Sequence, residues 1–328
     1  MNILVTGATG YLGKALVPVL QEAGHHLRIL ARPSSDIRAF QNQERIEISY
    51  GDIVKPETLN DIAEGIDQVY HLAVLGHLND AGQQDYMNVN HAGTLNLLEQ
   101  FKNSPVQRIL FTTSSAALGP IAGKVVTEED FAPPVTAYGR SKYAAELSFK
   151  EYAQQHNIPY VLVRLTHVYG PGEQRDLYQI IKLIKKGLYP QIGFKPNLYP
   201  AVYIDDAVRG LVRAMEKGRV GETYIISDKS SHDTRDIRKW VRHYLGLKNM
   251  IYPWLPKCLA LGLFTLCDYI SHKTGLRFPA TRKNIEFMTA RRIFSIEKAN
   301  TELDWEPQIT LEEGLRRTID AYRQEGLI

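Results

Sequence analysis

A tyrosine and a lysine stand four residues apart in the segment AYGRSK, as Tyr138 and Lys142. If this segment is helical, both side chains lie on one face of the helix. An ammonium group beside a phenol stabilises the phenolate and lowers its pKa from about 10, which makes the phenol a proton donor or acceptor near neutral pH. Because the same spacing occurs by chance in many helices, a second feature must support a site.

The second feature is a run of hydroxyl residues, TTSSAALG, that follows the apolar segment RILF. A hydroxyl at the end of a buried strand can orient the oxygen of a substrate carbonyl. We predict that Ser114 has this role, with Ser115 as the alternative. The other interpretation is that these hydroxyls only cap a turn.

Glycines are spaced along the first turn of the chain, where NILVT runs directly into TGATGYLG. A strand, a glycine-rich turn and a helix in this order bind the pyrophosphate of a dinucleotide, because the phosphates must approach bare backbone and the helix N-terminus offers free N–H groups. The alternative is a merely tight turn. The residues predicted to contact the cofactor here are Gly7, Thr9, Gly10, Tyr11, Leu12 and Gly13.

The end of the second predicted strand holds Ala31 and Arg32, where enzymes that use NAD often carry an acid for the ribose 2′-hydroxyl. A cation beside a small residue suits a 2′-phosphate, so NADP is favoured over NAD. Two alternatives stay open: Arg32 stacks on the adenine, or Asp36 folds back to the ribose. Asp52, in YGDI, is placed to bind the adenine or to cap the next turn.

Short β-branched runs alternate with segments of helical period from residue 2 to about 165, which predicts an α/β fold with a doubly wound parallel sheet of the Rossmann type. The alternation stops at YGPG, and the segments VYI and GETYIIS then resume it. We therefore predict a dinucleotide-binding domain from residues 1–170 and 199–227. A smaller, discontinuous C-terminal substrate-binding lobe takes residues 171–198 and 228–328.

Composition narrows the class of protein. Hydrophobic residues make up 44% of the chain and the net charge is +3, which fits a globular protein and does not favour nucleic acid as a partner. The two cysteines, Cys258 and Cys267, have no metal-ligand spacing, so we expect no metal site and a reducing compartment. With no signal-peptide pattern and no apolar run near the ~20 residues of a membrane span, a cytoplasmic location is expected.

Several of these motifs occur in one order along nearly the whole chain, and this order resembles the extended short-chain dehydrogenase/reductase family. They are TGATGYLG, GDI, HLA, NVNHAGT, TTSSAALG, YGRSK, RLTHVYGPG, YIDDA and ELDWEP. The resemblance implies a triad of Ser114, Tyr138 and Lys142, with Asn90 as a supporting polar residue. It also implies cofactor contacts from Ile53, Leu72, Ala73 and Asn90, and from Tyr138 and Lys142, whose ammonium group would hold the nicotinamide ribose.

Departures from the family's patterns indicate the branch. Dehydratases and decarboxylases of the family carry acids after the catalytic hydroxyl residue, where this chain has Ser115 and Ala116. Nucleotide-sugar epimerases use an arginine before the segment matching YIDDA, where this chain has Tyr199, and His167 departs from another of their motifs. A phenol is a poor substitute for a guanidinium that clamps phosphate. Arg282, Arg291 and Arg292 of the second lobe could instead supply the positive charge for a phosphate group.

A predicted apolar helix from Trp254 to Ile270, followed by a Gly-x-x-x-Pro turn and a basic stretch, resembles the branch of dihydroflavonol reductases and 3β-hydroxysteroid dehydrogenases. Its apolar face could line a substrate pocket, rest on a membrane surface as a peripheral contact, or pack within its own lobe.

Three functions follow. The leading hypothesis is an NAD(P)-dependent oxidoreductase that reduces a ketone or aldehyde, or oxidises an alcohol, on a hydrophobic, polyphenol-like or sterol-like small molecule. The second is a nucleotide-sugar 4-epimerase with tightly bound NAD, and the third is a dinucleotide-binding sensor or assembly protein without activity. The family's mode of dimerisation makes YAAELSFKEYA a candidate homodimer helix, although its aromatic residues equally fit packing against the sheet.

Overall fold

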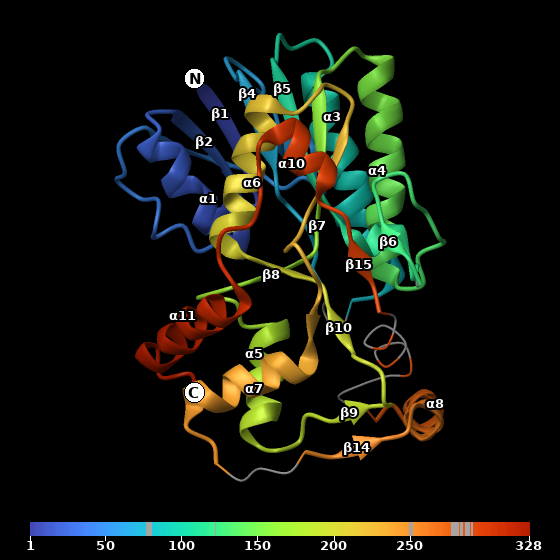
Figure 1. Ribbon diagram of the computed structural model, residues 1–328. Coiled ribbons are helices and arrows are strands. Elements are labelled where there is room, and N and C mark those ends of the chain that lie inside the picture. The colour runs from blue at the N-terminus through green and yellow to red at the C-terminus, as the bar shows by residue number, and fades with distance from the viewer. Residues whose placement is uncertain are drawn as a thin grey trace.

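The segments predicted as strands form one parallel sheet of seven strands in the computed structural model of the protein (Figure 1). The structure describes residues 1–76, 81–121, 123–248, 252–276, 282, 285, 289 and 291–328. In spatial order the strands are β12 (Thr223–Ile226), β7 (Tyr160–Leu165), β5 (Arg108–Ser114), β4 (Gln68–His71), β1 (Asn2–Thr6), β2 (His26–Ala31) and β3 (Ile46–Tyr50).

The strand order reverses at β1, because β2 and β3 extend the sheet to one side and β4, β5, β7 and β12 to the other. In open parallel sheets, ligands bind at such a switch point, outside the carboxyl ends of the strands. Thr6 at the end of β1 lies in register with His71 at the end of β4, and Ser114 with Leu165. The ends of the central strands therefore meet at one edge.

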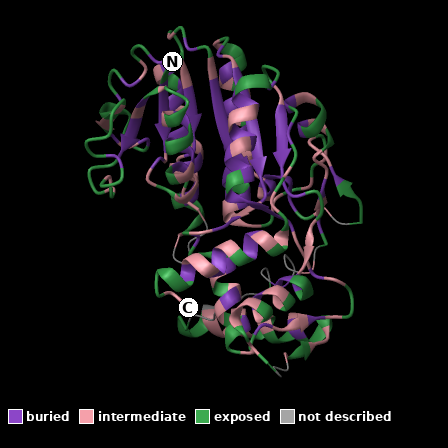
Figure 2. Ribbon diagram, turned by 60° about the vertical axis from the view of Figure 1, so that its left-hand side comes forward, coloured by how far each residue is buried: buried purple, intermediate pink, exposed green. Residues whose placement is uncertain are grey.

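Helices cover both faces of the sheet, as the nearly continuous apolar strands predict. One face packs against α1 (Tyr11–Glu22) and α6 (Ile204–Lys217), and the other against α3 (Gly93–Phe101) and α4 (Ala137–Gln155). Between them lie short elements: η1 (Pro56–Thr58), α2 (Gln83–Tyr86), the π-helical η2 (Met87–Ala92), η3 (Ser115–Leu118) and β6 (Val125–Val126). Figure 2 shows the sheet buried between these layers.

Below the sheet in Figure 1, a second lobe is built from segments that are distant in sequence. Its helices are α5 (Asp176–Lys185), α7 (Thr234–Leu245), α8 (Lys257–Thr274) and α11 (Leu311–Gln324), and α7 packs against both α5 and α11. Its short strands include β9 (Gln191–Ile192), β10 (Leu198–Tyr199), β13 (His232–Asp233) and β14 (Trp254–Leu255). The helix α10 (Glu297–Leu303) returns to the first domain, where it contacts α6 and β12, and β15 (Ile293–Phe294) pairs with β6 there.

Two expectations need correction. The segment VYI does not rejoin the main sheet, because β11 (Ala201–Tyr203) pairs with β8 (His167–Tyr169) in a separate two-stranded ladder; only β12 returns. The apolar segment that starts at Trp254 is not helical from its first residue, since Trp254 and Leu255 form β14 beside β9 and Pro256 precedes the helix. The Gly-x-x-x-Pro turn expected after the helix includes Pro279, which lies outside the described residues.

The carboxylate of Asp206 joins the end of the chain to α6. It accepts hydrogen bonds from the backbone N–H groups of Gln308 and Ile309, and the Trp305 indole donates to the Asp206 carbonyl. These contacts explain why YIDDA and ELDWEP occur together in one chain. Among the described residues, no helix has the length and apolar character needed to cross a membrane.

Candidate active site

The turn after β1 can pack closely against neighbouring backbone only because its glycines lack side chains. Gly7 has φ +72°, and a Cβ there would lie 2.6 Å from the backbone of Leu72 and Ala73. A Cβ on Gly13 would lie 2.4 Å from the Gly7 carbonyl oxygen, so α1 can approach β1 closely only with glycine at this position. The turn, with the partly exposed Thr9, therefore packs against the segment after β4. Contact of Leu72 and Ala73 with a cofactor stays a prediction.

The N-terminus of α1 fits a pyrophosphate. Gly10 is its N-cap and has no side chain to accept a hydrogen bond, and the first turn holds no acidic residue. Backbone N–H groups of Tyr11, Leu12 and Gly13 begin the helix, where the partial positive charge of the dipole favours an anion. The Tyr11 ring turns away toward the second lobe, where a Cβ on Gly170 would lie 3.0 Å from its hydroxyl.

The end of β2 presents a cation and not a carboxylate. Arg32 is exposed directly after the last residue of β2. The Asp36 carboxylate is bound by two nitrogens of Arg38, at 2.8 and 2.7 Å, and this pairing holds the pKa of Asp36 well below its usual range. Its carboxylate is thus engaged by Arg38, and contact between Asp36 and a ribose stays a prediction.

Asp52 and Ile53 follow β3 and have separate contacts. One carboxylate oxygen of Asp52 accepts from the Val54 N–H at 3.0 Å, so this side chain caps its own turn while it stays partly exposed. Ile53 is buried against Gly93 at the start of α3, and its carbonyl accepts from Asn96. Contact between Ile53 and a cofactor stays a prediction.

Ser114 and Tyr138 are brought together at the end of β5. Thr136 caps α4, which confirms that AYGRSK is helical, and a hydrogen bond joins the Tyr138 hydroxyl to Ser114. Ser114 also accepts from the Ala116 N–H at 3.2 Å, so its capping role and its contact with Tyr138 coexist. Ser115, the alternative, is buried in η3.

Lys142 lies one turn along α4 from Tyr138 and is buried. Its ammonium group donates to the Thr112 carbonyl at 2.8 Å and lies 4.7 Å from the centre of the Phe111 ring. Burial lowers the pKa of Lys142 to about 7, against an opposite effect of Glu146. The lysine is therefore close to its titration point at neutral pH.

The predicted effect of Lys142 on Tyr138 is wrong for this structure. The pKa of Tyr138 is raised to about 12, mainly by burial, and the hydrogen bond with Ser114 opposes the rise. Lys142 does not lower it noticeably because its ammonium group is bound to Thr112 and its own charge is weakened by burial. Tyr138 is thus a protonated phenol at neutral pH.

Asn90 supports the helix that carries the pair. It lies in the π-helical segment η2, a type of distortion frequent at functional sites. Its side chain accepts from the Leu75 N–H at 2.7 Å and donates to the Ser141 hydroxyl at 2.9 Å, which in turn donates to the Tyr138 carbonyl. Asn90 therefore connects the loop after β4 to the backbone of Tyr138.

The buried His71, which the sequence analysis included only as part of the HLA motif, links β1, α3 and β5 beneath the site. His71 exchanges hydrogen bonds with Thr6 at 2.7 Å and Thr94 at 2.9 Å, and its carbonyl accepts from Thr112, whose own carbonyl holds Lys142. Burial lowers the pKa of His71 to about 3, so the ring is neutral. A polar residue between apolar strand positions was the signal available in the sequence.

The second lobe contributes charges that sequence reasoning missed. The Asp176 carboxylate raises the pKa of both Tyr138 and Tyr199. It also lies 3.5 Å from the His167 ring. The Arg175 guanidinium lowers the pKa of Tyr138. Arg175 is exposed, and a Cβ on Gly76 would lie 2.2 Å from its guanidinium. The start of α5 therefore lies close to Tyr138 and the loop after β4.

His167 and Tyr199, the departures from the epimerase pattern, stack on each other with ring centres 4.7 Å apart. Of the alternative cations, Arg282 and Arg291 are exposed and Arg292 is buried, with its pKa lowered to about 10 by burial. The place predicted for a phosphate clamp thus holds an aromatic pair.

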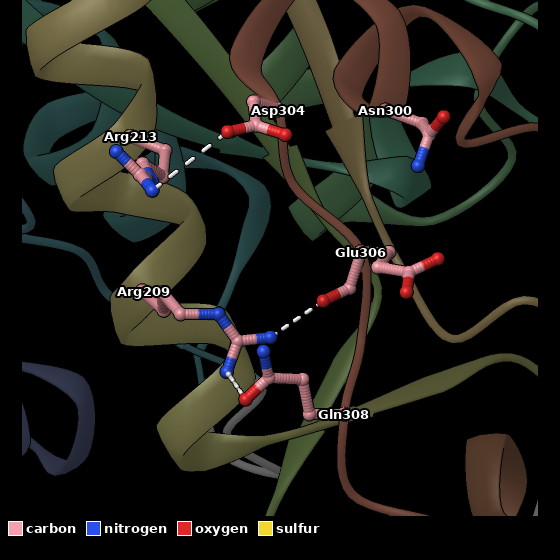
Figure 3. A pocket seen from close by; sticks show the side chains of 6 residues that line it. All are labelled: Arg209, Arg213, Asn300, Asp304, Glu306 and Gln308. Atoms are coloured by element: carbon pink, nitrogen blue, oxygen red, sulfur yellow. Dashed lines mark hydrogen bonds and ion pairs between the residues drawn. The ribbon is translucent and has the colours of Figure 1, made fainter.

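A cavity of about 500 Å³ lies away from these residues, between α6 and the segment after α10 (Figure 3). Arg209 donates to the Glu306 carbonyl and to Gln308, and Arg213 points toward Asp304. Because both arginines of α6 are engaged by protein groups, we assign this cavity to the contact between α6 and the C-terminal segment.

Comparison with known proteins places this geometry in a family. The model of the NAD dependent epimerase/dehydratase family matches residues 3–227. Sterol demethylase protein B of Methylococcus capsulatus is 29% identical, with 75% of each chain covered, and UDP-glucose 4-epimerase of Vibrio cholerae is 26% identical, with 98% of this chain and 96% of the other covered. The crystal structure of gox2253 superposes with a TM-score of 0.85 at 27% identity and covers 99% of both chains.

Proposed function

Because the chain belongs to the NAD-dependent epimerase/dehydratase family and is an enzyme of the extended short-chain dehydrogenase/reductase type, we propose that it interconverts a carbonyl and an alcohol on a hydrophobic, sterol-like or polyphenol-like small molecule. The observation that carries this proposal is the hydrogen bond between Ser114 and Tyr138, with Lys142 one helical turn away. Membership of the family does not by itself distinguish reduction from epimerisation or dehydration, since the family includes epimerases and dehydratases.

A bound nicotinamide dinucleotide supplies or accepts the hydride at the substrate carbon. In the reducing direction, the protonated Tyr138 gives its proton to the carbonyl oxygen, and Ser114 donates a hydrogen bond to the same oxygen. Lys142, whose pKa is lowered to about 7 by burial, is proposed to hold the nicotinamide ribose.

Two features support a hydrophobic substrate. The stacked pair of His167 and Tyr199 stands at the position where epimerases of the family use an arginine to bind a nucleotide diphosphate, and stacked aromatic rings favour apolar contact. Neither Ser115 nor Ala116 can move the second proton that a dehydration needs. The similarity to sterol demethylase protein B agrees with this substrate class.

The test is Tyr138→Phe, assayed by consumption of reduced nicotinamide with ketones of increasing apolar size. We expect kcat to fall by about 10² or more, because general acid catalysis contributes at least this much. Tyr143→Phe, five residues further along the same helix, is the matched control and should keep full activity. A Tyr138→Phe enzyme that retains more than about a tenth of kcat would refute the assignment.

For the cofactor, the family establishes dependence on NAD. We propose a preference for NADP, supported by the exposed Arg32 after β2 and by the engagement of Asp36 with Arg38. Arg32→Ala should raise the KM for NADPH about tenfold or more through loss of a charged hydrogen bond and leave the KM for NADH unchanged. Equal effects on both cofactors would show that Arg32 stacks on the adenine instead.

A nucleotide-sugar 4-epimerase is the second candidate, and Arg175 favours it. An exposed guanidinium close to Tyr138 suits an anionic group on the substrate. An epimerase would keep its dinucleotide through purification and turn over UDP-sugars without a net change in nicotinamide absorbance. Stoichiometric oxidation of NADPH would exclude this candidate.

A further inference from the structure

The lower end of the second lobe exposes a strip of apolar side chains along α8. The exposed fractions are 61% for Leu259 and 62% for Tyr269, and Leu263 and Leu266 between them are also at least half exposed. Positions 259, 263 and 266 follow the helical spacing, so the four side chains lie on one face. The opposite face is apolar as well, and packs Ala260, Leu261 and Phe264 into the lobe.

Two aromatic residues extend this strip beyond the start of α8. Phe194, after β9, is 85% exposed, and its ring lies 4.7 Å from that of Trp254 in β14. The Trp254 indole donates to the Gly193 carbonyl at 3.1 Å, which holds the pair in place. A Cβ on Gly193 would lie 3.8 Å from the Cβ of Lys257, the first residue of α8, so the aromatic pair adjoins the helix. We call the six residues Phe194, Trp254, Leu259, Leu263, Leu266 and Tyr269 the apolar ridge.

The charge around the apolar ridge is strongly one-sided. Residues 176–200 and 234–276, which include α5, α7 and α8, contain eleven Lys and Arg but three Asp and Glu, whereas the whole chain has 39 and 36. The exposed Lys195 and Lys257 flank the aromatic pair, and Lys273 lies in the last turn of α8. The remainder of the chain therefore carries a net negative charge, and the basic residues concentrate where the apolar ridge lies.

We propose that the apolar ridge and the lysines beside it bind the surface of an anionic lipid bilayer, with α8 lying in the interfacial plane. A helix in this position buries its apolar face among the acyl chains, tryptophan and tyrosine side chains settle at the level of the headgroups, and lysines contact anionic lipids. A protein partner would account for the exposed apolar residues but gives no reason for the excess of lysine and arginine around them. The proposal does not depend on the reaction catalysed.

The test is co-sedimentation of the whole protein with vesicles of phosphatidylcholine alone and of phosphatidylcholine with phosphatidylserine. We expect binding to the anionic vesicles, at least tenfold weaker binding to the neutral ones, and loss of binding at high salt. Leu263→Gln/Leu266→Gln should weaken binding at least tenfold. Lys257→Gln/Lys273→Gln should weaken it by about fivefold for each lysine.

Val19→Gln/Val220→Gln is the matched control, because it removes two exposed apolar side chains from the other domain. Phe194→Gln tests the same surface independently at a side chain that contributes little to the fold. Absence of binding to anionic vesicles, or unchanged binding by the Leu263 and Leu266 variant, overturns the proposal. It is also overturned if that variant only abolishes self-association of the protein in sedimentation velocity without lipid.

Discussion

The buried ammonium of Lys142 should destabilise the folded protein in a way that depends on pH. The group has an ordinary pKa of 10.5 in the unfolded chain and of about 7 in the folded protein, where burial disfavours the charge. Between these two values the unfolded chain binds more protons than the folded protein. The free energy of unfolding therefore rises with pH across this window and levels off above pH 10.5.

The magnitude follows from the two pKa values. At pH 7 the shift costs the folded state about 4 kcal/mol, and between pH 7 and pH 9 about 2 kcal/mol of this cost is relieved. Lys142→Met keeps most of the side-chain volume and removes the charge. It loses the hydrogen bond to the Thr112 carbonyl, worth about 1 kcal/mol, so a net gain in stability of a few kcal/mol is expected at pH 7.

The measurement is urea unfolding of the wild type and of Lys142→Met at pH 7, 8 and 9, without added cofactor. The advantage of the variant should shrink by about 2 kcal/mol from pH 7 to pH 9, while its kcat falls at every pH. Lys185→Met, at an exposed position in the last turn of α5, is the control and should show no such dependence. If the difference between wild type and Lys142→Met stays constant over this range, Lys142 is not a neutral or half-protonated group in the fold.

Three further predictions concern the turn, the hydroxyl and the second lobe. Gly13→Ala should weaken dinucleotide binding at least tenfold in calorimetry and lower Tm, because a Cβ would lie 2.4 Å from the Gly7 carbonyl; normal binding would show that α1 can move. Ser114→Ala should lower kcat by about 10² or less while Ser115→Ala does not, and the opposite order would transfer the role to Ser115. Arg175→Leu should raise KM at least tenfold only for substrates with an anionic group, and an equal rise for neutral ketones would make its role structural.

Much of the nucleotide-binding half could be predicted from local patterns. The apolar runs form strands because parallel strands buried on both faces need continuous apolar sequence. The glycine spacing of the first turn is a short motif, and Gly13 is required by the local backbone of Gly7 and Ala8. The helix carrying Tyr138 and Lys142 is confirmed as well. These features depend on short stretches of chain whose neighbours are close in sequence.

The errors and omissions arise where the outcome depends on distant contacts. VYI looks like a strand of the main sheet, but its partner is β8, and pairing cannot be read from one strand alone. The pKa of Tyr138 depends on how deeply the ring is buried and on Lys142 donating to Thr112, which the spacing of the two residues does not reveal. Arg175 and Asp176 approach Tyr138 from a segment with no recognisable motif.

The amino-acid sequence by itself determined the order of strands and helices, the cofactor turn and the residue types of the triad, since each is encoded in periodicity or in a short motif. Only the tertiary structure decided which charges surround Tyr138, that His71 links three elements beneath the site, and that one apolar face of α8 is exposed among basic residues. Burial and electrostatic environment are properties of the whole packed chain, because they depend on which distant segments displace water from a given side chain.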